Sequence, residues 1–106
     1  MKQVPLIVAG QPWQGQDLRP VVNPWNGSTV AEVAWAGSEQ LESALSAAAA
    51  TAPTMRAASR FQRSEWCRSI AAGLEQRLEE FAQIMTAESG KPIRLARDEV
   101  KRAITT

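Results

Sequence analysis

Few side chains in this 106-residue sequence could perform chemistry, and their types exclude most catalytic sites. Histidine is absent, which excludes Ser–His–Asp triads, Cys–His dyads and most zinc sites. Cys67 is the only thiol, and a nucleophilic cysteine needs an activating base or cation and access to solvent. Cys67 instead lies on an apolar helical stripe, and free cysteines are commonly buried. The sequence therefore predicts that Cys67 is a buried packing residue.

Paired carboxylates are the other candidates for acid–base catalysis. Two adjacent pairs occur, Glu79-Glu80 and Asp98-Glu99, and both fall in expected helices. Neighbouring side chains on a helix point about 100° apart, so neither pair converges on one substrate atom. We expect both pairs to lie on solvated faces.

Patterns for nucleotide or nucleic-acid binding are also missing. Gly10, Gly15 and Gly27 are widely spaced and are followed by strands or loops, whereas a phosphate-binding loop leads into a helix. Four tryptophans could form a stacking surface, but no basic groove accompanies them. We expect them to anchor a core or an interface, with Trp25 exposed in a turn or in contact with another subunit.

Composition limits the partners and the compartment. The formal net charge is +1, which gives no electrostatic reason to expect nucleic acid or an anionic membrane as a partner. The alanine-rich stretch at 43–55 is too short and too weakly apolar to span a bilayer, and the apolar run at 4–9 is too short for a signal peptide. A single cysteine cannot form an internal disulfide, so a cytoplasmic protein is expected.

The apolar content favours a folded chain with a thin core. Val, Ile, Leu and Phe together provide 21 of the 106 residues, and alanine provides 18. Alanine favours helix but buries little area. We expect a folded segment whose apolar faces need partners, either further parts of a longer chain or other subunits.

β-strand and turn signals occupy the chain as far as about Gly37. The expected elements are a hairpin between residues 5–9 and 12–13, a strand at 18–22 and a strand at 28–35. Pro20 predicts an edge position for the middle strand, because proline cannot donate to the ladder. Asn26-Gly27 supplies the positive φ angles of a tight turn between the last two strands.

Helical periodicity follows. Ser38 is the expected N-cap of a first helix, and Pro53 should end it because the residue before a proline disfavours helical geometry. Ser59 and Gln62 have the form of a capping box that begins a second helix. Gly73 predicts a bend or break at 73–77.

The end of the chain predicts one further helix. Gly90 should end the preceding helix as its C′ residue, and Pro92 can occupy the first position of the next. Asp98 and Arg102 form an expected i, i+4 ion pair. The inward stripe consists of Ile93, Ala96, Val100, Ala103 and Ile104. This pattern has not ended at Thr106, so a chain cut in mid-helix is expected.

Together these signals predict an α+β segment of N-terminal β-hairpins followed by three to four amphipathic helices, divided into residues 1–37 and 38–106. These signals leave two interpretations of the function open. A non-catalytic helical interaction module predicts cooperative unfolding of this chain alone and no exposed apolar face. A DNA-binding helical domain predicts salt-dependent binding, and the balanced charge disfavours it.

One set of motifs is more specific than any single residue. Residues 88–92 (Glu-Ser-Gly-Lys-Pro) and 96–100 (Ala-Arg-Asp-Glu-Val) resemble the E-T/S-G-K-P and A-x-x-E-V signature of the aldehyde dehydrogenase superfamily. Residues 22–27 (Val-Asn-Pro-Trp-Asn-Gly) and 31–33 (Ala-Glu-Val) resemble the V-N-P-x-x-G and A-E-V hairpin of the same family. The order and spacing agree over most of the chain, from about residue 5 onward.

The resemblance implies the α/β aldehyde dehydrogenase fold. In that fold residues 1–37 would be a β arm of hairpins that contributes to a homo-oligomer. Residues 38–106 would be the helical part of the coenzyme-binding domain, truncated before the catalytic domain. The sequence at 59–106 resembles the corresponding sequence in the branch of the family that acts on small semialdehydes, lactaldehyde or phosphonoacetaldehyde.

The family implies NAD- or NADP-dependent oxidation of an aldehyde to an acid, with a nucleophile in a G-Q-x-C segment and a glutamate in an E-L-G-G-K segment. Neither segment occurs here, so the catalytic role does not pass to Cys67, and this chain alone is expected to be inactive. Pro24-Trp25-Asn26 is similar to the start of the family's oxyanion segment, but Gly27 follows it where that segment has an aromatic residue. The hairpin interpretation is therefore preferred.

The resemblance implies one ligand site within this sequence. In several members a monovalent cation is held by backbone carbonyls at the V-N-P segment, by the acid before x-G-K-P and by a later residue, which places Val21, Val22 and Glu88 at the site. Oxygen ligands suit a hard cation. The alternative is that Glu88 is only a helix-terminal acid, whose charge is unfavourable at a helix C-terminus unless something compensates it.

Overall fold

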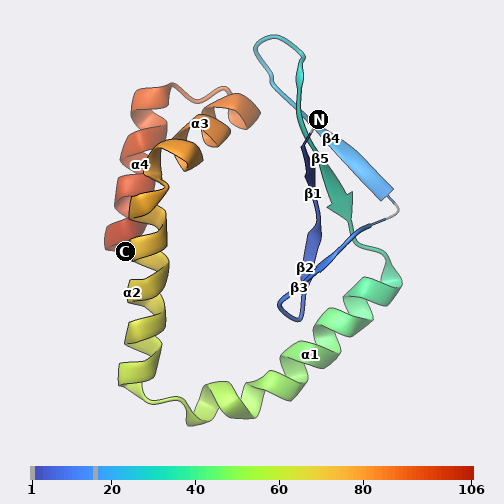
Figure 1. Ribbon diagram of the computed structural model, residues 1–106, viewed down its shortest axis with the longest axis vertical. Helices are drawn as coiled ribbons and strands as arrows, with labels where there is room; N and C mark the ends of the chain where they lie inside the picture. The colour runs from blue at the N-terminus through green and yellow to red at the C-terminus, as the bar shows by residue number, and fades with distance from the viewer. Residues whose placement is uncertain (1, 16) are drawn as a thin grey trace. The chain divides into compact units, whose positions relative to one another are not determined.

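The computed structural model describes residues 2–15 and 17–106 and consists of strands followed by helices (Figure 1). Two compact units are present: the first runs to Val22 and includes Thr29–Ala57, and the second comprises Asn23–Ser28 and Ala58–Thr106. The predicted α+β segment is confirmed, with four helices in the described residues. The elements are β1 (Gln3–Val4), β2 (Leu6–Val8), β3 (Gln11–Trp13), β4 (Asp17–Val22), β5 (Thr29–Trp35), α1 (Ser38–Ala57), α2 (Arg60–Gln76), α3 (Leu78–Ser89) and α4 (Ile93–Thr105).

In the first unit, β2 and β3 form the predicted hairpin. They pair antiparallel, with Leu6 opposite Trp13. Ala9 and Gly10 connect the strands with φ angles of 52° and 76°. Positive φ at both positions matches the turn type whose twist suits two paired strands.

A three-stranded sheet has the order β1-β5-β4. β4 pairs antiparallel with β5 and lies at the edge, so the edge position predicted from Pro20 is confirmed. β1 pairs in parallel with β5, with Gln3 opposite Glu32. This pairing was not predicted, because a two-residue strand is too short to show a periodic pattern. A register shift between Val21 and Val22 marks a β-bulge in the β4–β5 ladder.

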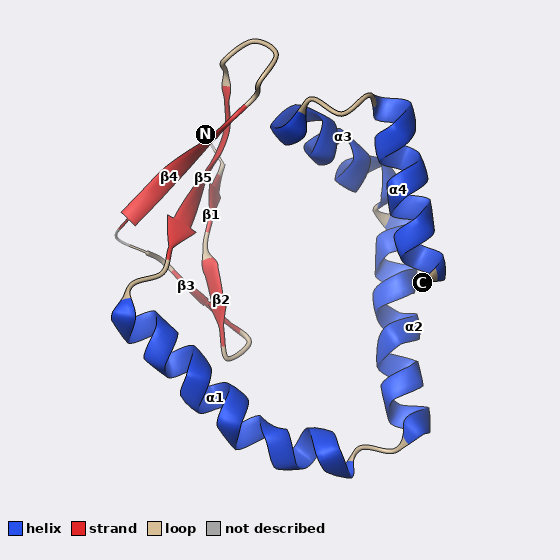
Figure 2. Cartoon of the chain, turned by 180° about the vertical axis from the view of Figure 1, so that it is seen from behind, coloured by secondary structure: helices blue, strands red, loops and turns tan. Residues whose placement is uncertain are grey.

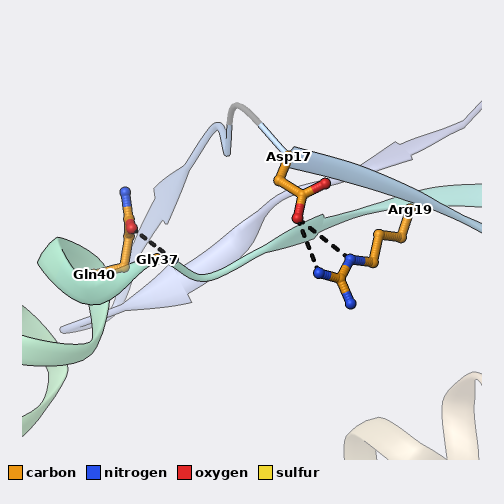
Figure 3. Close-up of polar contacts among 4 residues, drawn as sticks. All are labelled: Asp17, Arg19, Gly37 and Gln40. Carbon is orange, nitrogen blue, oxygen red and sulfur yellow. Dashed lines mark hydrogen bonds and ion pairs between the residues drawn. The ribbon is translucent and has the colours of Figure 1, made fainter.

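The start of α1 differs from the prediction by one residue. α1 begins at Ser38 itself, so Gly37 takes the capping position that was predicted for Ser38. The Gly37 N–H donates to Gln40 Oε1 at 2.9 Å (Figure 3), and the Gly37 carbonyl accepts from the Leu41 N–H at 3.1 Å. A glycine is an acceptable cap because the Gln40 side chain bonds the N–H that precedes the helix.

The predicted end of this helix at Pro53 is wrong, because α1 continues to Ala57. Pro53 cannot donate to the carbonyl four residues earlier, and its ring crowds that carbonyl. The alanine-rich residues before Pro53, and Met55, Arg56 and Ala57 after it, favour helix strongly enough to continue it. Thr51 Oγ1 also donates to the Ala47 carbonyl at 2.8 Å, a contact that tends to bend helices. The result is a curved helix (Figure 2).

Charged and aromatic side chains support the edge strand β4. Arg19 Nε and Nη2 donate to Asp17 Oδ2 at 3.3 and 3.1 Å (Figure 3). The guanidinium lies 4.0 Å from the centroid of the Trp35 ring on β5, a cation–π contact. Trp35 and Trp13 line a hollow beside the start of α1. Trp35 is 51% exposed and Trp13 is half-buried, so neither is a fully buried core anchor.

In the second unit, α2 begins and ends where the sequence predicted. The Ser59 side chain accepts from the Gln62 N–H at 3.1 Å, and the Gln62 side chain accepts from the Ser59 N–H at 2.9 Å. This confirms the capping box. The helical run breaks at Arg77, whose φ and ψ are −112° and 20°. The break predicted near Gly73 is therefore confirmed, and the Gly73 carbonyl accepts from the Arg77 N–H at 3.3 Å.

α3 and α4 pack together and form the core of this unit (Figure 1). The buried residues are Ala82 of α3 with Ala96 and Val100 of α4. One member of the predicted inward stripe departs from the prediction: Ala103 is exposed. Ile104 packs on the core as predicted. Ala103 lines an open hollow beside Cys67 and Ile70 of α2, so its side chain is not covered. The remaining partly buried side chains are Leu78, Met85 and Ile93.

Large apolar side chains are exposed on several elements. Trp25 is 90% exposed, which confirms the expectation for that residue, and Phe61 and Ile70 on α2 are 72% and 64% exposed. The buried residues of the described chain are three alanines and one valine, so little apolar area is buried. The predicted thin core with open apolar faces is therefore confirmed. Among the described residues, no helix is both long and apolar enough to cross a membrane.

Candidate functional site

The connection between α3 and α4 is a tightly bonded turn formed by the predicted motif at 88–92. α3 ends at Gly90, whose φ of 73° is left-handed and whose N–H donates to the Thr86 carbonyl at 3.0 Å. Ser89 Oγ donates to the Met85 carbonyl at 2.6 Å and accepts from the Lys91 N–H at 3.3 Å. The Ser-Gly pair therefore satisfies backbone groups that a helix end leaves open.

α4 begins one residue later than predicted. Pro92 is the N-cap of α4, not its first helical residue, and its carbonyl accepts from the Ala96 N–H at 3.0 Å. Its ψ of 135° is extended, as the capping position requires. Proline is acceptable there because it has no N–H to leave unsatisfied.

The turn Asn23–Ser28 connects β4 and β5 and, like the turn between α3 and α4, is held by several internal hydrogen bonds. Asn23 Oδ1 accepts from the Trp25 N–H at 2.9 Å, and Asn26 Oδ1 accepts from the Ser28 N–H at 3.0 Å. The Gly27 N–H donates to the Asn23 carbonyl at 2.9 Å, and Gly27 has a φ of 72°. Asparagine side chains that bond the backbone two residues on are typical of such turns.

These two turns meet within the second unit, although more than sixty residues separate them in the sequence. A Cβ atom built on Gly90 would lie 3.1 Å from Pro24 Cγ, so the absence of a side chain permits the approach. A hollow between the turns is lined by Asn23, Trp25, Thr86, Ala87, Gly90, Lys91 and Pro92. The two family-like motifs found in the sequence are therefore parts of one site.

Thr86 is a member of this site that the sequence analysis missed. Its Oγ1 atom is buried and has no hydrogen-bond partner among the described residues. A buried hydroxyl without a partner is unfavourable. A threonine four residues before the helix-ending glycine gave no local signal, because its burial depends on the turn from β4 to β5.

The three predicted cation ligands lie in different parts of the chain. Val21 and Val22 end β4 in the first unit, and Glu88 lies in the last turn of α3 in the second. Their chemistry fits a hard cation, because all three would offer oxygen atoms. At the bulge the register passes from Val21 opposite Ala31 to Val22 opposite Thr29, so both predicted ligand residues keep a partner in the ladder and the residue passed over is Val30 of β5. Asn23 and Ala87, the chain neighbours of Val22 and Glu88, both line the hollow in the second unit.

The two predicted carboxylate pairs do not converge. Glu79 accepts two hydrogen bonds from Arg97, whereas its neighbour Glu80 accepts two from Arg77. The hydrogen bonds from Arg97 and then Gln83 lower the pKa of Glu79 to about 2. Each carboxylate is neutralised by its own cation, so neither is poised as a general acid.

In the second pair, Asp98-Glu99, an ion pair is present at Glu99 and not at Asp98 among the described residues. Glu99 forms an ion pair with Lys91 of the motif turn. The hydrogen bond from Lys91 is the main cause that lowers the pKa of Glu99. The predicted Asp98–Arg102 pair is not among the ion pairs of the described residues. Lys91 therefore ties the turn to α4 and is not a free cation.

The prediction that Cys67 is buried is wrong, because this cysteine is exposed. α4 contacts α2, but the last residues of α4 leave a hollow beside Cys67 and Ile70 instead of covering them. A helical stripe shows which face is apolar, and it does not show whether a neighbour covers that face.

In the described part of the chain, no three His, Cys, Asp or Glu side chains group in a way that could hold a metal ion.

The aldehyde dehydrogenase family model matches residues 12–106. The chain is 40% identical over 82 residues to succinate semialdehyde dehydrogenase (NAD(P)+) Sad of Escherichia coli, covering 77% of this chain and 18% of that protein. It is 31% identical over 100 residues to lactaldehyde dehydrogenase of Escherichia coli, covering 92% and 21%. This chain thus spans about a fifth of the length of these relatives.

Solved structures agree with this match. Aldehyde dehydrogenase 21 from Physcomitrella patens, in complex with the reaction product succinate, superposes with a TM-score of 0.94 at 36% identity, covering 98% of this chain and 22% of that one. Lactaldehyde dehydrogenase from Escherichia coli superposes with a TM-score of 0.91 at 30% identity, covering 97% and 22%. The meeting of the two motif turns, the family model and these structures lead to one conclusion: the chain belongs to the aldehyde dehydrogenase family.

Proposed function

We propose that this chain is the N-terminal segment of an NAD(P)-dependent aldehyde dehydrogenase that oxidises a small aldehyde or semialdehyde to the acid. The observation that carries the proposal is the family match over residues 12–106. Support for the substrate class comes from relatives named for succinate semialdehyde and lactaldehyde. A solved relative in complex with succinate adds to that support.

Within this enzyme the chain has a structural role. Residues 1–37 form the β arm of a homo-oligomer, and residues 38–106 form the helical part of the coenzyme-binding domain. NAD or NADP accepts the hydride when bound, and its binding groups lie outside this chain. Support comes from the sequence, which lacks the nucleophile and glutamate segments of the family.

The single cysteine supports a cytoplasmic location.

A monovalent cation bound by the Val21 and Val22 carbonyls and the Glu88 carboxylate completes the proposal. Support comes from the chemistry of the three groups, because two backbone carbonyls and a carboxylate are the oxygen ligands that a hard cation prefers. A carboxylate in the last turn of a helix is also unfavourable without a compensating positive charge. The role of the cation would be to stabilise the fold and not to react.

The enzymatic proposal is tested by expressing a longer reading frame that contains this chain and measuring NAD+ and NADP+ reduction. Succinate semialdehyde and lactaldehyde are the first substrates. Turnover is expected from the longer protein and not from the 106 residues alone. Cys67→Ser should leave turnover unchanged, since Cys67 is outside the nucleophile segment. A folded longer protein without turnover of any aldehyde would refute the proposal, and turnover lost in Cys67→Ser would reassign the nucleophile.

The cation is tested separately by thermal unfolding in potassium, sodium and tetramethylammonium chloride at equal ionic strength. A higher Tm in potassium or sodium is expected, and Glu88→Gln should remove the difference. Glu42→Gln, on the exposed face of α1, is the matched control and should keep it. Equal Tm values in the three salts would exclude the cation and leave the enzymatic proposal untouched.

A non-catalytic helical interaction module is the second candidate, but it predicts no exposed apolar face, so the exposed Phe61, Trp66 and Ile70 side chains of α2 count against it. It requires that cells contain a 106-residue product that unfolds cooperatively. Sedimentation and urea unfolding of this chain distinguish the two. Self-association or non-cooperative unfolding supports a segment that needs the rest of an enzyme.

A further inference from the structure

We draw no further inference here: the strongest candidate, the exposed apolar face of α2 formed by Trp66, Cys67 and Ile70, carries nothing because nothing in the structure shows what covers it.

Discussion

Arg97 of α4 donates two hydrogen bonds, at 2.9 and 2.8 Å, to the carboxylate of Glu79 at the start of α3. The two residues are eighteen positions apart, and their helices share the small core of the second unit. The buried part of that core is two alanines and a valine, and the Glu79–Arg97 pair adds a direct polar contact between α3 and α4. Both side chains are about half exposed, so salt will weaken the pair.

This pair predicts a specific loss of stability in acid. The folded pKa of Glu79 is about 2, below its ordinary value of 4.5. A depressed carboxyl pKa stabilises the folded state above the unfolded pKa, and the stabilisation is lost as the pH falls from 4.5 towards 2. Glu79→Gln should unfold at lower urea than the parent at neutral pH and lose less stability over that acid range. Circular dichroism at matched ionic strength measures both.

Glu42→Gln is the control for this prediction, because Glu42 is an exposed carboxylate on α1. It should follow the parent at every pH. If Glu79→Gln and Glu42→Gln give the same pH profile, the Arg97 contact does not stabilise the fold.

Gly90→Ala should destabilise the second unit for two separable reasons. The left-handed φ of 73° at Gly90 costs a residue with a Cβ about 1–2 kcal/mol. The new Cβ would also lie 3.1 Å from Pro24 Cγ, which adds a steric term. Gly27 has a similar φ, and a Cβ added there would have no atom within 4 Å. Gly27→Ala should therefore show the cost of the left-handed φ without the steric cost. Urea midpoints of the two variants give the difference.

Two further variants check this interpretation. Pro24→Ala should reduce the effect of Gly90→Ala, since it removes the atom that the new Cβ approaches. Gly73→Ala, in the interior of α2 with open space around it, should instead stabilise by about 0.5–1 kcal/mol. Equal losses in Gly90→Ala with and without Pro24 would mean that the two turns do not meet.

Thr86→Val should stabilise the protein by up to about 1 kcal/mol, because it replaces a buried hydroxyl that has no partner among the described residues. Thr51→Val is the matched control, since the Thr51 hydroxyl donates to the Ala47 carbonyl at 2.8 Å. That variant should gain nothing. Thermal unfolding compares them, and a clear loss in Thr86→Val would show that the hydroxyl binds a group in the hollow.

Cys67 should react readily with a thiol reagent in the native chain, because it is exposed. The labelling rate should be close to the rate in urea, and Cys67→Ser should give no label. In a longer protein that folds over α2, the same thiol should be protected. Slow labelling of this chain alone would mean that the α2 face is already covered, by self-association for example.

Local signals predicted the starts, stops and turns of this chain well. The capping box of Ser59 and Gln62, the break after Gly73 and the left-handed Gly90 were all predictable, because each depends on residues within one turn of helix. The edge position of β4 followed from Pro20 alone. The motifs at 22–27 and 88–92 also identified the family before any fold was known.

Other features depended on the tertiary structure. Local rules could not show that α1 continues past Pro53, since the penalty of one proline competes with the propensity of a whole helix. They could not show that Arg97 pairs with Glu79 and not with a residue on its own helix. They could not show that the Asn23–Ser28 turn meets Gly90, or that Cys67 is exposed. By itself, therefore, the sequence determined the elements and the family, because caps, turns and motifs are short-range. Which faces are covered, and which charges meet, was decided by contacts between distant segments that no local pattern encodes.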